Sequence, residues 1–117
     1  MTRLTDAERQ AITAAAAAAY PKEAGGFLFI REGANARREL QWCDNASPTP
    51  EVEFRFFPAD LRDAVAELRL GFHGICWHSH PDGPAILSAR DQLAFANPPL
   101  CHFSPLVVSC NGASLAW

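Results

Sequence analysis

The sequence has no long hydrophobic run and no secretion signal. No stretch reaches the 18 or so apolar residues that a membrane-spanning helix needs. The N-terminus carries Asp6 and Glu8 and continues into alanines, whereas a signal peptide has a basic segment followed by an apolar one. These absences predict a cytoplasmic protein.

Basic charge is scarce as well. The 117 residues include 10 Lys or Arg against 13 Asp or Glu, a formal net charge of −3. A nucleic-acid partner requires a basic stripe that neutralises phosphates, so nucleic acid is excluded as the main partner. The one basic cluster, Arg37 and Arg38 with Arg31 nearby, is expected to be a solvated turn.

The four cysteines form no C-x-x-C pair and have no zinc-finger spacing. Cys43, Cys76, Cys101 and Cys110 are therefore expected to be reduced and buried as small apolar side chains. Cys76 is of particular interest because it lies two residues before His78. The missing cysteine pair also excludes a zinc-dependent nucleobase deaminase, which needs H-x-E and P-C-x-x-C.

What is present suits one globular domain over residues 1–117, with 49% hydrophobic and 20% charged residues. Apolar periodicity, caps and turn residues predict alternating helices and strands. The expected elements are a helix from the capping box Thr5–Glu8 to Pro21, strands over 25–30, 38–43 and 51–57, a helix from Pro58 that stops at Gly71, a strand over 73–78, a helix over 88–96, and a hairpin turning at Asn111-Gly112. This order predicts an α+β fold, an α/β sandwich in which helices flank a mixed β-sheet.

The strand over 51–57 is expected because Val52, Phe54 and Phe56 alternate with charged residues. Such alternation is typical of a strand with one solvated face.

The stretch HSHPDGPAILSARD, residues 78–91, concentrates residues that bind metals. On an extended strand His78 and His80 project from the same face and Ser79 points away. Ser88 and Asp91 share a face of the following helix, so Asp91 can supply a carboxylate as a third ligand. Three protein ligands with a fourth position open to water are typical of a catalytic zinc site.

Each half of this stretch also has an ordinary structural explanation. Two histidines at this spacing are often only polar surface, and Ser88-Ala89-Arg90-Asp91 is also a helix cap. Together, however, the halves place scarce residue types at fixed offsets around a Pro–Gly–Pro turn, which favours the metal site.

The motif H-S-H-P, then seven residues from His80 to Ser88, then Ser-x-x-Asp, resembles the signature of the JAMM (JAB or MPN+) zinc metalloproteases. The upstream part of that signature, a glutamate followed by glycine and an apolar strand, resembles residues 21–28. Asn45-Ala46-Ser47 with residues 54–60 resembles the middle of bacterial and phage members. The resemblance spans roughly residues 10–110.

The resemblance implies a zinc-dependent peptidase or isopeptidase that binds one Zn²⁺ per chain. His78, His80 and Asp91 would hold the metal. Glu23 would be the general base that takes a proton from the attacking water and passes it to the leaving amine, and Ser88 would hydrogen-bond the oxyanion.

The implied substrate is a protein or peptide. Bacterial relatives either process ubiquitin-like carrier proteins at a Gly-Gly tail or belong to phage tail assembly, and residues 20–26 and 45–61 resemble the phage group more closely. A phage role would place the protein in the cytoplasm or with the virion. Gly25 stands where many bacterial members carry cysteine, a difference expected to affect packing and not chemistry.

The alternative is a non-catalytic MPN-type scaffold or interaction domain on the same fold. Inactive relatives lack the metal ligands, whereas every ligand position is filled here, which favours the enzyme.

Overall fold

A computed structural model describes residues 4–110 and, for the backbone, residues 115–116, so the predicted turn at Asn111-Gly112 lies outside the described residues. The elements are α1 (Asp6–Ala19), β1 (Gly25–Arg31), β2 (Arg37–Cys43), α2 (Pro58–Arg69), β3 (His73–His80), α3 (Ala89–Phe95), a 3₁₀ turn η1 (Leu100–His102), β4 (Ser104–Ser109) and β5 (Leu115–Ala116). None of these helices is long and apolar enough to cross a membrane.

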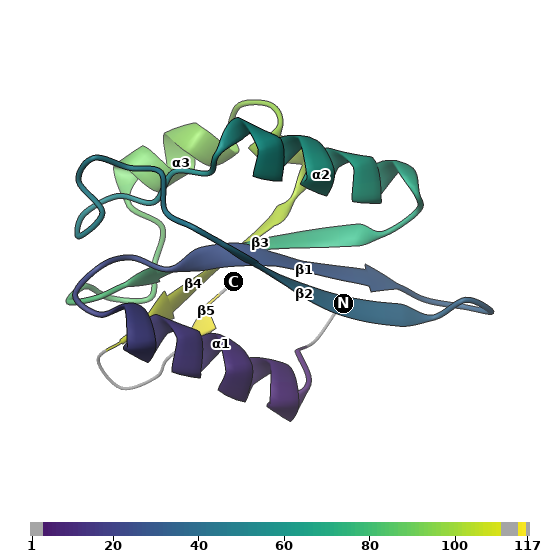
Figure 1. Cartoon of the computed structure of the whole chain (residues 1–117), viewed down its shortest axis with the longest axis horizontal. Helices are drawn as coiled ribbons and strands as arrows, with labels where there is room; N and C mark the ends of the chain where they lie inside the picture. Colours follow the sequence, from purple (N-terminus) through teal and green to yellow (C-terminus); the bar gives the residue numbers. More distant parts are fainter. Residues whose placement is uncertain (1–3, 111–114, 117) are drawn as a thin grey trace.

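The strands form one sheet in the order β2-β1-β3-β4-β5. All neighbours are antiparallel except β3 and β4, which are parallel. Helix α1 covers one face of the sheet, and α2 and α3 lie on the other (Figure 1). The predicted α+β fold with a mixed sheet between helices is confirmed.

The core has two parts because alternate residues of the central strands face opposite sides of the sheet. In β1, Leu28 and Ile30 pack toward α1, whereas Phe27 and Phe29 pack toward α2. The part on the α1 side contains Leu4, Ile12, Ala16, Leu28, Ile30, Ile75, Trp77, Leu106 and Val108. The part on the α2 side is largely aromatic and contains Phe27, Phe29, Ala64, Phe72, Cys76 and Phe103.

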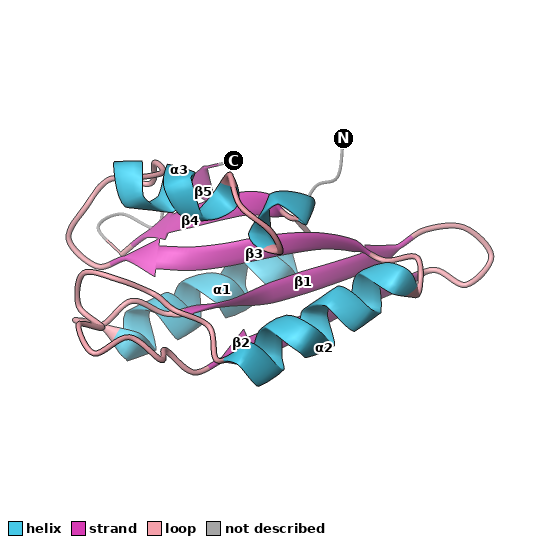
Figure 2. Ribbon diagram, turned by 90° about the horizontal axis from the view of Figure 1, so that it is seen from above, coloured by secondary structure: helices cyan, strands magenta, loops and turns pink. Residues whose placement is uncertain are grey.

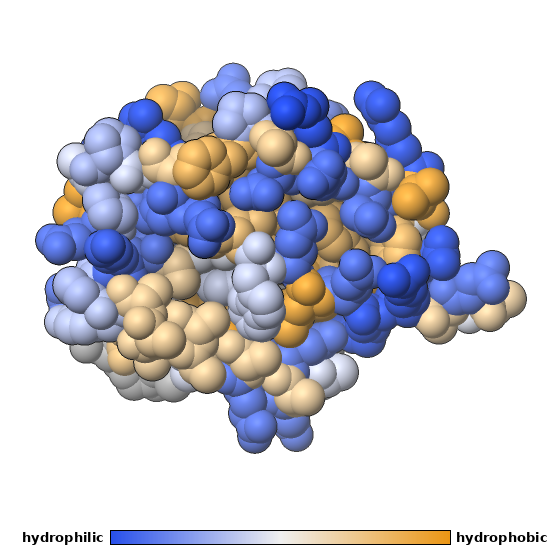
Figure 3. All heavy atoms as spheres, in the orientation of Figure 1, coloured by the Kyte–Doolittle hydropathy of each residue, from blue (hydrophilic) through white to orange (hydrophobic). Residues whose placement is uncertain are grey.

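Helix α1 begins at the predicted capping box, in which Thr5 and Glu8 exchange hydrogen bonds. Its exposed side is rich in alanine and forms the pale orange area over this helix in Figure 3. The expected solvated turn at Arg31, Arg37 and Arg38 is wrong, since all three residues lie on β1 and β2. The guanidinium of Arg38 forms an ion pair with Glu8 at 2.7 Å, and this pair joins α1 to the edge strand.

The predicted strand over 51–57 is also wrong, because this segment is a loop without sheet pairing. The carboxamide of Asn45 forms hydrogen bonds with backbone N–H and C=O groups that a strand would use to pair with its neighbour. Its Oδ1 accepts hydrogen bonds from the amides of Ser47 (2.9 Å) and Arg55 (3.1 Å), and its Nδ2 donates to the carbonyl of Glu53 (2.9 Å). Local side-chain bonds of this kind compete directly with a β-ladder.

The apolar residues of this loop do not share one packed face. Val52 is 65% exposed, whereas Phe56 stacks on Phe27 with ring centroids 4.7 Å apart. Phe54 lies over Gly25, where a Cβ atom would come within 2.7 Å of the Phe54 ring. The glycine thus affects packing, since it leaves room for Phe54.

Burial of the cysteines varies along the chain. Cys76 is buried in the aromatic part of the core, Cys43 and Cys110 are half-buried, and Cys101 is exposed, so the expectation of burial is wrong for Cys101. Burial raises the pKa of Cys43 to about 12 and that of Cys76 well above its usual value. These two thiols therefore stay protonated at neutral pH and are poor metal ligands.

Gly26 provides a test of the packing between β1 and its neighbours. A Cβ atom there would overlap the Gln41 carbonyl oxygen of β2 and approach Trp77 Nε1 of β3 to 3.1 Å. Because the carbonyl belongs to a paired strand and the indole is buried, we expect Gly26→Ala to lower the free energy of unfolding by about 2–3 kcal/mol in urea denaturation. Gly83→Ala is the control, since its new Cβ would meet nothing closer than 3.6 Å from His80. Equal stability of the two variants would contradict this packing.

Candidate metal centre

The candidate site lies at the end of β3, where β1 begins. The antiparallel register sets Gly25 opposite His78, so Glu23, two residues before the strand, reaches the histidines. Because β3 and β4 are parallel, the chain must cross over between them, and this crossover carries α3 past the same end of the sheet (Figure 2). Segments distant in sequence thereby meet at one place.

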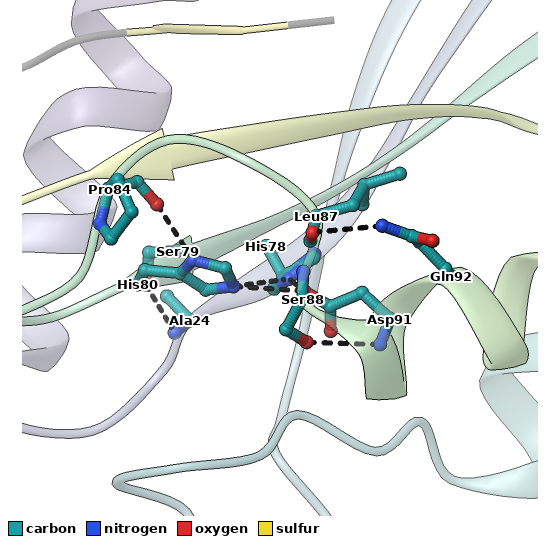
Figure 4. A network of polar contacts seen from close by, with 9 residues as sticks. All are labelled: Ala24, His78, Ser79, His80, Pro84, Leu87, Ser88, Asp91 and Gln92. Carbon is teal, nitrogen blue, oxygen red and sulfur yellow. Dashed lines mark hydrogen bonds and ion pairs between the residues drawn. The ribbon is translucent and has the colours of Figure 1, made fainter.

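Three predicted ligands converge there (Figure 4). His78 Nε2 lies 3.1 Å from His80 Nε2 and 3.1 Å from Asp91 Oδ2, and His80 Nε2 lies 3.0 Å from the same oxygen. All three side chains are largely buried. Ligand atoms of a tetrahedral zinc ion lie about 3.3–3.4 Å apart, so a small opening of this triangle suffices for the metal.

The hydrogen bonding of His80 indicates that a cation would suit the space between the two histidine Nε2 atoms and Asp91 Oδ2. His80 Nδ1 donates to the carbonyl oxygen of Pro84 at 2.9 Å, so in the neutral ring the Nε2 atom carries a lone pair. That lone pair faces the Asp91 carboxylate and the His78 ring nitrogen, and such an arrangement calls for a cation. Two imidazole nitrogens and one carboxylate oxygen are ligands that zinc prefers, so the residues present fit this metal.

The charges of this cluster support each other. Burial would raise the pKa of Asp91, but hydrogen bonds with His78 and with the protonated ring of His80 outweigh the effect of burial and hold the pKa of this carboxyl well below its usual range. The hydrogen bond with Asp91 in turn raises the pKa of His80, against the opposing effect of burial. Asp91 is therefore an anion at any pH near neutral, as a ligand must be.

Glu23 is the buried carboxyl beside the cluster, with 7% of its surface exposed. One of its oxygens and a ring nitrogen of each histidine lie within 4.8 Å of one another. Burial raises the pKa of Glu23 to about 7; nearby His80 and Arg90 lower it, and nearby Asp91 and Glu53 raise it. A carboxyl with this pKa can both accept and release a proton at neutral pH.

Ser88 caps the N-terminus of α3, as the sequence also suggested. Its Oγ accepts a hydrogen bond from the amide of Asp91 at 3.1 Å, and the Asp91 carboxylate accepts one from the amide of Ser88 at 3.0 Å. The cap and the metal site are thus compatible, because the cap orients Asp91 toward the histidines. The hydroxyl accepts with a lone pair, so its proton can be donated to another group.

Ser79 contributes in a way that the sequence did not indicate. Its side chain is fully buried, and its Oγ accepts a hydrogen bond from the amide of Ala24 at 2.8 Å. The Ser79 amide donates to the Ala24 carbonyl, also at 2.8 Å. The residue between the two histidines therefore holds the residue next to Glu23. Alternation predicted that Ser79 points away from the histidines, but no sequence signal identified its partner.

Two hollows flank the cluster, and Phe54 lines both. The larger, of about 720 Å³, lies beside Glu23 and is lined by Ala18, Ala19, Tyr20, Pro21, Lys22, Glu23, Ala24, Cys43, Asp44, Asn45, Ser47, Pro50 and Phe54. The smaller, of about 310 Å³, lies beside Asp91 and is lined by Glu53, Phe54, Arg55, Phe56, Leu61, Arg90, Asp91, Ala94 and Leu100. One hollow thus reaches Glu23 and the other reaches Asp91.

Known proteins share this sequence pattern and fold. Residues 5–117 match the family model described as prokaryotic homologs of the JAB domain. The solution structure of protein DSY2949 from Desulfitobacterium hafniense superposes with a TM-score of 0.71 at 26% sequence identity, over 96% of this chain and 77% of that one. No curated protein matches the sequence. The family match covers nearly the whole chain, and the chain therefore belongs to the prokaryotic JAB-domain family.

Proposed function

We propose that this protein is a zinc-dependent peptidase or isopeptidase. The observation that carries the proposal is the convergence of His78, His80 and Asp91 within 3.0–3.1 Å of one another, with the buried carboxyl of Glu23 beside them. A structural metal site needs no such proton acceptor at its edge. A hydrolytic site requires one, because water must lose a proton as it attacks.

The residues divide the chemistry among them. A zinc ion held by the two histidines and Asp91 would activate water and polarise the scissile carbonyl. Glu23 takes the proton of the attacking water and delivers it to the leaving amine, for which a pKa of about 7 is well placed. Ser88 donates its hydroxyl proton to the developing oxyanion, an interaction worth about 3–4 kcal/mol in comparable sites.

The two hollows beside the cluster favour an extended peptide as substrate, with chain on both sides of the scissile bond. Phe54 lines both hollows, so a residue without a side chain would pass its ring most easily. A Gly-Gly tail of a ubiquitin-like carrier protein meets this condition, and a phage tail protein is the second substrate class. A non-catalytic scaffold would not need the polar groups arranged around the metal ligands.

Metal binding is tested with Asp91→Ala. Loss of one of three ligands should weaken zinc binding by at least about 100-fold, as measured by competition with a chromophoric chelator. Ser88→Ala is the matched control, since it removes the same helix cap but no ligand, and its affinity should stay within about tenfold of the parent. Similar losses in both variants would indicate that the helix, and not ligation, is responsible.

Catalysis is tested with Glu23→Gln, which keeps the size of the side chain and removes the base. The zinc-loaded parent should cleave a ubiquitin-like carrier protein extended past its Gly-Gly tail, with the product identified by intact mass. The variant should lose about 10²–10⁴-fold in kcat and still bind zinc. Full activity in Glu23→Gln would refute the mechanism. A zinc-bound parent without activity on this probe and on tail proteins would favour the scaffold.

The pH dependence of zinc binding follows from His80. A proton on this ring competes with the metal, and the hydrogen bond with Asp91 raises the pKa of His80 above the ordinary value of 6.5. Zinc affinity should therefore be highest near pH 8 and should begin to fall while the pH is still above 6.5. Zinc competition titrations between pH 8 and pH 5 measure this. A constant affinity over that range would exclude histidine ligation.

A further inference from the structure

The loop between β2 and α2, residues 44–57, holds Glu23 although it has no strand or helix of its own. The amide of Glu23 donates to the carbonyl oxygen of Pro50 at 2.7 Å. The carbonyl oxygen of Glu23 accepts a hydrogen bond from Asn45 Nδ2 at 3.2 Å. Both backbone polar groups of Glu23 are thus bound by this loop.

The half-buried carboxamide of Asn45 bonds backbone groups along most of this loop. Its Nδ2 also approaches the carbonyl oxygens of Pro50 (3.4 Å) and Glu53 (2.9 Å), and its Oδ1 accepts from the amides of Ser47 and Arg55. One side chain therefore braces the loop from its start to its end. Only a carboxamide provides donors and an acceptor at one place for these contacts.

The next residue is held from the other side. Ser79 binds both the amide and the carbonyl of Ala24, so the four backbone polar groups of Glu23 and Ala24 are all bound. Two of these bonds come from β3, whose position the core secures. The other two come from the loop, which has no ladder to support it and in which Asn45 bonds the backbone of Ser47, Glu53 and Arg55.

We infer that Asn45 is a positioning residue for Glu23, an inference that rests on the general-base role proposed above. Asn45 does not reach the metal ligands, and it acts by holding the backbone from which the Glu23 carboxyl projects. A base must lie within hydrogen-bond reach of the proton that it removes, and a displacement of about 1 Å can cost about 100-fold in rate. Asn45 therefore contributes to turnover and not to metal binding.

Three variants test this role. Asn45→Ala removes all the side-chain contacts. Asn45→Asp keeps an oxygen for the amides of Ser47 and Arg55 but cannot donate to Glu23, and it serves if the alanine variant does not fold. Ser47→Ala is the matched control, because it removes the Ser47 hydroxyl bonds within the same loop and leaves those between Asn45 and Glu23. Thermal unfolding verifies that each variant is folded.

The first readout is amide hydrogen exchange at Glu23 by NMR, in protein without substrate. The Glu23 amide hydrogen should exchange about tenfold faster in both Asn45 variants. The Pro50 carbonyl oxygen that accepts this amide would no longer be held by the Asn45 side chain. Ser47→Ala should leave the exchange nearly unchanged. Unchanged exchange in both Asn45 variants, or an equal increase in Ser47→Ala, would overturn the inference.

The second readout is kinetic, on the carrier protein extended past its Gly-Gly tail. Both Asn45 variants should lose about 10–100-fold in kcat, with KM and zinc affinity close to those of the parent. An unchanged kcat despite faster exchange would also overturn the inference. If the parent cleaves nothing, the proposed function fails, and the exchange at Glu23 still decides whether Asn45 holds this residue.

Discussion

The antiparallel pairing of β1 with β3 is the constraint on which the site depends. The register of this pairing sets Gly25 opposite His78. Two hydrogen bonds between Ala24 and Ser79 continue the pairing one residue beyond the start of β1. Because side chains alternate between faces, a slip of one residue would turn the histidines toward α1 and separate them from Glu23. The hydroxyl of Ser79, on the opposite face of the sheet, thus keeps Glu23 in line with the candidate metal ligands.

Residues of the site are held by bonds that also serve the fold. Asp91 joins α3 to β3, because its carboxylate both completes the capping box with Ser88 and approaches the histidines. Asn45 shapes a loop and holds Glu23 with the same carboxamide. Such double use places the candidate site groups on rigid supports, and it makes a control variant necessary whenever one of these residues is replaced.

Sequence patterns succeeded where the decisive interaction was local. The capping boxes at Thr5 and Ser88 were predictable because each is complete within four residues. The prediction of a strand over 51–57 was wrong, because alternation of apolar and charged residues indicates two different faces but does not supply a partner strand. Asn45, six residues before this segment, offered its backbone a different set of partners.

By itself the sequence determined that His78 and His80 share a face and that Ser88 caps the helix carrying Asp91, because strand periodicity and capping patterns are local. It also determined the JAB-domain family, through the match of residues 5–117 to the family model. Only the tertiary structure decided that Glu23 lies beside these histidines, that burial raises its pKa to about 7, and that Ser79 and Asn45 hold its backbone. Contacts between residues far apart in sequence, and the loss of water around a carboxyl, exist only when separate elements have packed together.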